Sequence, residues 1–173
     1  MELLFIVIIA IAIVETILSS TWNRAYFSYG IPIFSYEPAL RNPLPTKIDS
    51  KKLEYSQQPK YFVALKVHRF SDKLFGVREA AWGGFGAISY TPIMHGKIEI
   101  RDNGQLRITG LVNWFTAFFT IVFIGLAMQW GSDDQMVFVL PAFLFCLLGW
   151  IYITQKKRFI ELADIAASQT SDS

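Results

Sequence analysis

The sequence predicts an α+β membrane protein in which three transmembrane helices hold a small β-rich domain between the first helix and the second. Apolar runs predict the helices: Leu3–Val14 near the N-terminus, then Leu111–Trp130 and Met136–Ile153. The last two runs contain no charged residue, and each is long enough to cross roughly 30 Å of hydrocarbon as a helix. Alternating apolar and polar residues between the first and second runs predict the strands.

Composition agrees with a membrane location and limits the function classes. Hydrophobic residues make up 53% of the chain, and the apolar runs account for most of this excess. The formal net charge is only +2, with acids interleaved among the bases, so no nucleic-acid partner is expected. Cys146 is the only cysteine, which excludes an intrachain disulfide.

The N-terminal run is expected to be a retained transmembrane anchor over residues 1–21. A cleaved signal peptide is the alternative, but it needs a basic start and a small-residue cleavage site. The only early side-chain charge is Glu2, and no such site precedes Ser19. Trp22 and Arg24 follow the run, as expected for an aromatic residue at the membrane interface and a cation among the headgroups.

The second and third runs are separated only by Gly131–Gln135, which leaves room for a tight turn. We therefore expect a transmembrane helical hairpin over residues 111–153, with Pro141 tolerated early in its second helix. The tail, residues 154–173, is expected to continue as a helix over Lys156–Ala167. Phe159 and Leu162 would lie on one side of that helix.

The distribution of charge predicts the orientation. All 16 Lys and Arg residues fall within residues 22–110 or after Ile153, including the cluster Lys156-Lys157-Arg158. The opposite side of a three-span chain carries Glu2, Asp133 and Asp134 and no base. By the positive-inside tendency, we expect a multi-pass inner-membrane protein with its N-terminus outside and both the middle domain and the tail in the cytoplasm.

Residues 25–59 are expected to form an irregular connector, because five prolines each remove a backbone donor and restrict the preceding residue. The aromatic first part, Tyr26–Phe34, fits two interpretations: the apolar edge of the small domain, or a segment lying along the lipid headgroups. Asp49–Gln58 is compatible with a short helix that has Ser50 as its N-cap.

From Tyr61 the apolar residues recur at every second position. This period predicts a strand over Tyr61–His68, a turn at Ser71–Lys73 and a returning strand over Leu74–Ala80. The glycines of Trp82–Gly86 lack the spacing of either nucleotide-binding fingerprint, so they are interpreted as allowing a bend or a close backbone approach.

A β-hairpin is expected over Lys97–Thr109, closed by the loop Asp102–Gly104. A two-residue Asn-Gly loop would place charged residues opposite isoleucines and mix the two faces. A three-residue loop keeps the faces separate, with the pairs Ile100–Leu106, Ile98–Ile108 and Glu99–Arg107. This loop ends on Gly104 in the left-handed conformation. Gly110 then joins the hairpin directly to the second span.

No catalytic, cofactor-binding or metal-binding residue is predicted. His68 and His95 are the only histidines, and neither lies at metal-ligand spacing from a cysteine or from the other. The serines have no evident base, and Asp72 and Glu79 are interpreted as surface acids. We therefore expect neither enzymatic activity nor a cofactor.

Glu15 is the one ionisable residue inside an apolar segment, where acids are costly and often functional. Because it lies about two turns before Arg24, the favoured interpretation is that its carboxylate reaches Arg24 or the headgroups. Both Glu15→Gln and Glu15→Leu are then expected to be tolerated. Small residues at helical spacing predict close packing of the anchor on the hairpin: Ala12, Thr16 and Ser20, with Ala142 and Cys146 in the third run.

These observations lead to two functional hypotheses. The first is a small, non-enzymatic integral membrane protein that presents a membrane-proximal β domain to lipid or to a larger membrane complex. The second is an oligomeric transport or channel component that uses Glu15 and Asn113 as pathway residues. Three spans are too few for a pore, so the second hypothesis requires self-association.

Overall fold

The computed structural model describes residues 2–38, 48, 53–54, 64–80, 93–129 and 136–168. These residues form an α+β fold with a five-stranded antiparallel sheet in the order β1-β5-β4-β3-β2. The helices are α1 (Glu2–Ser20), α2 (Arg24–Ser28), α4 (Trp114–Gln129) and α5 (Met136–Ser168). The strands are β1 (Pro32–Tyr36), β2 (Leu65–Ser71), β3 (Leu74–Glu79), β4 (Met94–Ile100) and β5 (Leu106–Val112).

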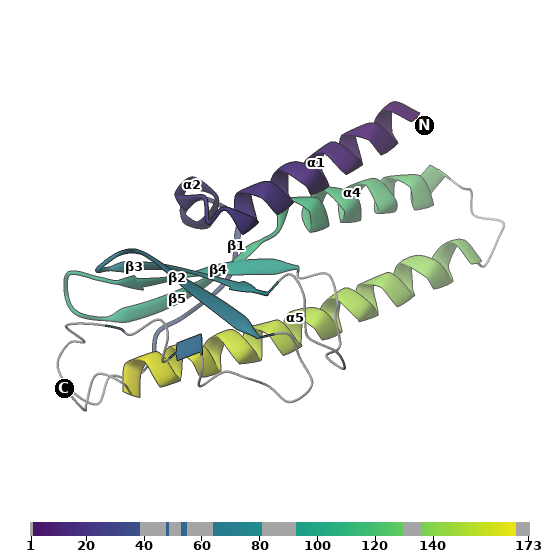
Figure 1. The fold of residues 1–173 in the computed structure, drawn as a ribbon. Helices are drawn as coiled ribbons and strands as arrows, with labels where there is room; N and C mark the ends of the chain where they lie inside the picture. Colours follow the sequence, from purple (N-terminus) through teal and green to yellow (C-terminus); the bar gives the residue numbers. More distant parts are fainter. Residues whose placement is uncertain are drawn as a thin grey trace.

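The sheet lies between two helical layers (Figure 1). The short helix α2 and the end of α1 cover one face, and the C-terminal half of α5 covers the other. The helices α1 and α4 lie side by side and extend past the sheet, and the N-terminal half of α5 extends in the same direction. The predicted α+β class with a small sheet is therefore confirmed.

The three predicted membrane spans are only partly matched. By length and composition, Glu2–Ser20 is the one helix in the described ranges that is long and apolar enough to cross a membrane, with a mean hydropathy of 2.6. The apolar stretch of α4, Trp114–Ala127, is shorter. The second apolar run was expected to be helical from Leu111, and this is wrong. Leu111 and Val112 belong to β5, because both are paired with β4 in the sheet.

The β4–β5 hairpin has the predicted register. Its Cα partners include Ile98 with Ile108, Glu99 with Arg107 and Ile100 with Leu106. The amide of Gly104 donates a hydrogen bond to the carbonyl of Arg101 at 2.8 Å, which closes the turn. Gly104 has a φ of 80°, the left-handed conformation expected for this loop.

The preceding hairpin is also confirmed where it is described. Strand β2 ends at Ser71 and β3 begins at Leu74, so the predicted turn lies between them. Leu65 and Val67 are buried, whereas Lys66 and His68 are exposed, as the alternation predicts. The first part of the predicted strand, residues 61–63, and the glycines of Trp82–Gly86 lie outside the described residues.

The irregular connector predicted for residues 25–59 is wrong in its first part, which contains α2 and β1. Asn23 caps α2 by accepting a hydrogen bond from the amide of Tyr26 at 3.2 Å. Pro32 begins β1, an edge strand, where a residue without a backbone donor is tolerated. Leu53 and Glu54 are helical, as expected for that stretch, and the proposed cap Ser50 lies outside the described residues.

The domain-edge interpretation of the aromatic segment after the anchor holds for part of it. Tyr26 and Phe27 are buried against the sheet, which is the domain-edge interpretation. Tyr29 and Ile31 are exposed by 76% and 65%, which leaves an apolar surface next to the end of α1. The headgroup interpretation therefore remains a prediction for these two residues.

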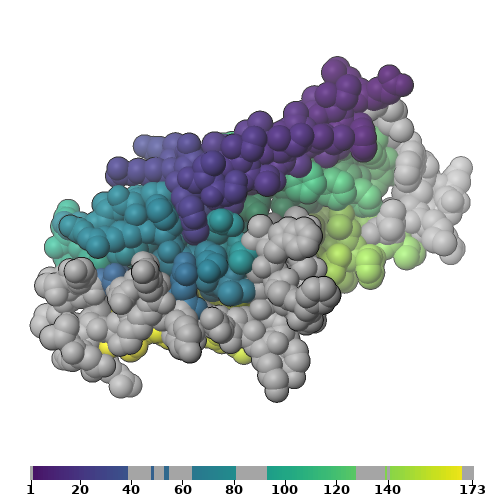
Figure 2. All heavy atoms as spheres, viewed as in Figure 1, coloured from purple at the N-terminus to yellow at the C-terminus, as the bar shows by residue number. Residues whose placement is uncertain are grey.

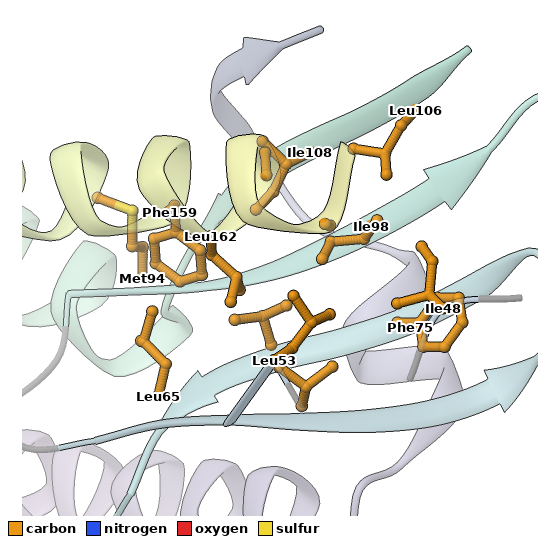
Figure 3. Packing of buried hydrophobic residues seen from close by; sticks show 14 of the residues in the cluster. Ile48, Leu53, Leu65, Phe75, Met94, Ile98, Leu106, Ile108, Phe159 and Leu162 are labelled. Carbon is orange, nitrogen blue, oxygen red and sulfur yellow. The ribbon is translucent and has the colours of Figure 1, made fainter. Parts of the chain in front are cut away.

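The hydrophobic core fills the space between the sheet and α5 (Figure 3). The helix contributes residues at the spacing of one helical face, and all four are fully buried: Phe159, Leu162, Ala163 and Ala166. The sheet contributes alternate residues of four strands, including Leu65, Phe75, Met94, Ile98, Leu106 and Ile108. Gly96 leaves room for the ring of Phe159, since a Cβ at Gly96 would lie 2.8 Å from it.

Helix α5 joins two predicted elements into one. It runs for 33 residues through Pro141, so the third apolar run and the tail helix are continuous. Such a helix is about 50 Å long. The prediction that Phe159 and Leu162 share one side is confirmed, and that side is the one packed on the sheet.

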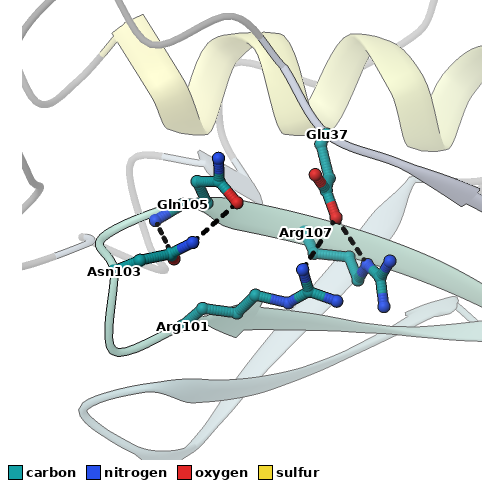
Figure 4. A network of polar contacts seen from close by, with 5 residues as sticks. All are labelled: Glu37, Arg101, Asn103, Gln105 and Arg107. Atoms are coloured by element: carbon teal, nitrogen blue, oxygen red, sulfur yellow. Dashed lines mark hydrogen bonds and ion pairs between the residues drawn. The ribbon is translucent and has the colours of Figure 1, made fainter.

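The edge of the hairpin is tied to β1 by a surface network (Figure 4). Glu37, directly after β1, accepts from Arg107 Nε at 2.8 Å and pairs with Arg101 at 3.2 Å. Asn103 and Gln105 exchange two hydrogen bonds within the loop. Exposed pairs of this kind contribute little individually, so the network fixes the edge more than it stabilises the fold.

Helix α1 packs against α4 as expected, but of the three small residues predicted for this contact only Ala12 is half-buried. The more buried side of α1 carries Leu4, Ile8, Ile11, Glu15 and Leu18. The predicted small residues Thr16 and Ser20 are exposed and donate back to carbonyls of their own helix. Ala142 and Cys146 are exposed on α5 as well. Much of α1 forms the outer surface seen in Figure 2.

We predict that Gly104→Ala destabilises the protein by about 1 kcal/mol or more, because a Cβ is disfavoured at a positive φ. Thermal or chemical unfolding of the detergent-extracted protein measures this loss. Gly125→Ala is the matched control: Gly125 lies within α4, and a Cβ there would meet no atom within 4 Å. Equal stability of the two variants would contradict the prediction.

Candidate functional site: a buried polar cluster at the helix–sheet junction

Four polar residues from four parts of the fold meet where the long helices join the sheet. They are Glu15 of α1, Tyr26 of α2, His95 of β4 and Asn113, which immediately precedes α4; we call them the Glu15 cluster. Glu15, Tyr26 and His95 are almost fully buried. Buried polar groups of this kind must find partners within the protein.

Glu15 caps the N-terminus of α4. One carboxylate oxygen accepts a hydrogen bond from the amide of Trp114 at 2.7 Å, and the other accepts from the amide of Phe115 at 2.7 Å. These are the first two amides of the helix, which have no partner within it. The negative carboxylate also lies at the positive end of the helix dipole. A residue of α1 thus satisfies the first two amides of α4.

The expected role of Glu15 is therefore wrong. Its carboxylate was expected to reach Arg24 or the headgroups, but it turns inward to α4 and Tyr26. Only 6% of the residue is exposed, whereas Arg24 is exposed on α2. The interior position is favoured because hydrogen bonds from two backbone amides and a hydroxyl compensate the Glu15 carboxylate for its lost hydration.

Tyr26 connects Glu15 to Asn113. Its hydroxyl lies 2.5 Å from Glu15 Oε1, to which it donates, and 3.4 Å from Asn113 Oδ1. Burial and the neighbouring Glu15 carboxylate raise the pKa of Tyr26 above its ordinary value. The phenol therefore keeps its proton and serves as a hydrogen-bond donor.

His95 links the same cluster to the sheet. Its ring stacks on the ring of Tyr26 with centroids 4.1 Å apart. Nδ1 lies 2.8 Å from Asn113 Oδ1, and Nε2 lies 3.2 Å from the carbonyl of Tyr26. Burial lowers the pKa of His95, an effect that the hydrogen bonds to Asn113 and Tyr26 and the charge of Glu15 partly offset. The neutral imidazole is therefore favoured at neutral pH.

A second buried polar group lies on the opposite face of the sheet. Glu79 of β3 forms an ion pair with Arg158 of α5 and accepts a hydrogen bond from Gln155 Nε2 at 3.1 Å. Gln155 Oε1 accepts from the amide of Ile93 at 3.2 Å. We call Glu79, Gln155 and Arg158 the Glu79 cluster; all three are buried.

The Glu79 cluster corrects two interpretations of the sequence. Glu79 was interpreted as a surface acid, but it follows Phe75 and Val77 on the face of β3 that packs on α5. Arg158 was grouped with Lys156 and Lys157 among the bases next to the membrane. Its side chain is instead directed into the domain, where it pairs with Glu79.

The site residues considered from sequence are thus partly brought together. Glu15 and Asn113, named for a transport pathway, belong to one cluster through Tyr26. His95 joins them, whereas His68 lies on the surface, stacked on Trp22. Among the described residues, no group of three or more His, Cys, Asp or Glu side chains could hold a metal ion.

Tyr26 and His95 were missed as site residues because helix α2, which carries Tyr26 and covers His95, was not predicted. His95 alternates with Lys97 and Glu99 along β4, which is the pattern of a solvent-facing side. At His95 this face is covered by α2. A helix of 5 residues is too short to show a helical period of apolar residues in the sequence. The Asn23 cap was the one available signal.

The chemistry of the Glu15 cluster favours a structural junction. Both oxygens of Glu15 already accept hydrogen bonds from within the protein, so the carboxylate is held rather than presented to a ligand. The cluster joins α1, α2, β4 and the start of α4. It therefore fixes how the long helices leave the sheet.

We expect Glu15→Leu to destabilise the protein by roughly 3 kcal/mol or more, because two helix amides and a buried hydroxyl lose their acceptor. Glu15→Gln retains one acceptor oxygen and is expected to cost about 1–2 kcal/mol. Thr16→Val is the control: its exposed hydroxyl bonds only within α1, and the expected change is within roughly 0.5 kcal/mol. Unfolding in detergent measures all three, and a wild-type stability for Glu15→Leu would refute the capping role.

Stability should also depend on the titration of His95. Its native pKa lies below the ordinary value of 6.5, so the unfolded chain binds this proton more tightly than the folded protein. The contribution is fully present above 6.5 and is lost as the pH falls from there toward the lowered native pKa. Unfolding at about pH 7.5 and about pH 5.5 should show a smaller difference in His95→Gln than in wild type. The exposed His68→Gln is the control, and an unchanged difference in His95→Gln would count against this assignment.

Comparisons with protein-family models, with curated proteins and with solved structures found no match. The contacts of the Glu15 cluster itself identify a junction between helices and sheet.

Proposed function

We propose that this chain is a three-span integral membrane protein of the inner membrane that holds its β domain against the cytoplasmic surface. In this proposal, α1, α4 and the first half of α5 are the spans. The domain interacts with lipid headgroups or with a larger membrane complex, and it catalyses no reaction.

The observation that carries the proposal is the exposed apolar surface of these three helices. Leu3 on α1 is 75% exposed, Ile121 on α4 is 67% exposed and Phe143 on α5 is 65% exposed. No charged residue lies within Leu111–Trp130 or Met136–Ile153. An exposed apolar surface of this extent is typical of contact with a membrane or a partner rather than water.

Length and direction support the same proposal. At 1.5 Å per residue, the 19 residues of α1 and the 16 of α4 are about 28 Å and about 24 Å long. All three helices extend beyond the same end of the sheet in Figure 1. One bilayer could therefore receive them together, with the sheet left outside the hydrocarbon.

The orientation follows from charge. The side that carries the sheet holds all 16 Lys and Arg residues, and the other side holds Glu2, Asp133 and Asp134. Arg158 does not contribute to this charge asymmetry at the membrane surface, because it pairs with Glu79 inside the domain. Arg24, Lys156 and Lys157 remain near the spans and favour a cytoplasmic domain.

The rival function is an oligomeric transport component. One observation favours it: Glu15 and Asn113, the two polar residues named for a pathway, belong to one cluster. A carboxylate already bonded to three internal donors would have to exchange partners during transport, which favours the first proposal. The native mass of the detergent-extracted protein separates the two, because the rival requires a homo-oligomer.

Reporter fusions test the membrane topology. A reporter joined after Asp134 should behave as extracytoplasmic, and reporters joined after Ser89 and after Ser173 should behave as cytoplasmic. The positive-inside asymmetry is the physical reason for this result. A cytoplasmic signal at Asp134 would overturn the orientation and with it the position proposed for the β domain.

A further inference from the structure

A cluster of aromatic and basic side chains lies where the anchor helix meets the sheet. It consists of Trp22, Lys66, His68 and Arg78, which we call the Trp22 site. Lys66 and Arg78 are directly paired residues of β2 and β3, so their side chains lie on the same face. The rings of Trp22 and His68 are stacked with centroids 5.1 Å apart.

Trp22 ends helix α1 in the left-handed conformation, with a φ of 53°. The amides of Trp22 and Asn23 donate to the carbonyls of Ser19 and Leu18, which is the hydrogen-bond pattern of a Schellman motif at a helix C-terminus. The Trp22 ring stacks on Phe27 at 5.1 Å, and the guanidinium carbon of Arg78 lies 4.6 Å from its centroid. These two contacts hold the indole ring beside the guanidinium.

Arg78 has unused binding capacity. Its Nη1 makes one long hydrogen bond, 3.4 Å, to the carbonyl of Glu79. Its Nε is buried and has no hydrogen-bond partner among the described residues. Burial lowers the pKa of Arg78, and the charge of Glu54 offsets only part of this effect. A partly dehydrated guanidinium that makes one long hydrogen bond within the described part of the chain is suited to an oxyanion.

Charge around the site favours an anion as well. Lys66 and Arg78 are next to one another, and Arg24 is exposed on the adjacent helix α2. The facing acid is Glu54, whose carboxylate lies 3.5 Å from Lys66 Nζ. Among the described residues, the two neighbouring bases thus face one carboxylate, which leaves the site with an excess of positive charge.

Position along the chain indicates which anion. Trp22 follows the end of α1 by two residues, and α1 is the described helix that qualifies as a membrane span. Tryptophan and basic residues at the end of a span lie at the depth of the headgroups. A cytoplasmic leaflet is rich in anionic lipid, which attracts bases at this depth.

We propose that the Trp22 site binds the phosphodiester of an anionic phospholipid headgroup. The Arg78 guanidinium contacts the phosphate oxygens, Lys66 adds a second positive charge, and Trp22 lies at the interface beneath the guanidinium. This proposal rests on the proposed membrane function, which places the end of α1 at the bilayer surface.

Native mass spectrometry of the full-length protein in detergent micelles tests the site. Equal amounts of phosphatidylglycerol or phosphatidylcholine are added, and retained lipid is counted. Wild type should retain phosphatidylglycerol preferentially. Arg78→Gln should reduce this retention by roughly tenfold, the change expected when one charge-assisted contact is lost. Arg69→Gln is the matched control, since Arg69 lies on the same hairpin and already pairs with Asp72.

Each outcome decides the proposal. Unchanged phosphatidylglycerol retention in a folded Arg78→Gln protein would overturn it, as would displacement of the lipid by an equal concentration of inorganic phosphate. If Arg78→Gln does not fold, Lys66→Gln decides, because the Lys66 side chain is 47% exposed and its loss leaves the core intact. Reduced retention then supports the site, and wild-type retention overturns it. The reporter fusions report separately on the membrane topology, so a failed lipid site and a failed membrane assignment are distinguishable.

Discussion

The fold depends first on the contact between Glu15 and the start of α4. Helix α4 begins directly after β5, with Asn113 alone between them, and its first amides need acceptors from outside the helix. Glu15, which lies 99 residues earlier than Trp114, supplies the acceptor. The contact requires α1 to lie beside α4, and it brings Tyr26 and the covering helix α2 into place. One carboxylate thus determines the positions of three elements.

The two faces of the sheet are organised by the same principle. On one face, Glu15 is satisfied by amides and a hydroxyl; on the other, Glu79 is satisfied by Arg158 and Gln155. Apolar contacts alone would let a helix slide or rotate on the sheet at small cost. A buried charge must meet its partners, because leaving it unpaired is expensive. The polar clusters therefore specify where each helix lies, while Phe159, Leu162 and their neighbours supply the buried area.

Local patterns were sufficient for the hairpins. Alternation along Lys97–Thr109 and the need for a left-handed Gly104 determine one register, and both are properties of a short segment. The α+β class followed from the change of period along the chain. In contrast, α2 and β1 were missed. The prolines were interpreted as excluding regular structure, but a proline such as Pro32 is compatible with an edge strand, where its missing donor is not needed. The partners of the Glu15 and Glu79 carboxylates are distant in sequence, so no local pattern identifies them. The sequence holds a signal that was not used: Glu79 follows Phe75 and Val77 at strand spacing, and Gln155 and Arg158 share helical spacing with Phe159 and Leu162.

The continuity of α5 has a mechanical consequence. Residues 136–153 form the apolar part of α5. Residues 154–168 are fixed to the sheet by the hydrophobic core and by the ion pair of Arg158 with Glu79. A helix without a break behaves as a rigid lever, and the segment beyond Ile153 is about 22 Å long. A change of about 10° in the tilt of the first part would displace the far end by about 4 Å unless the sheet moves with it. In the proposed membrane arrangement, this rigidity would couple the thickness of the bilayer to the angle between the β domain and the membrane surface.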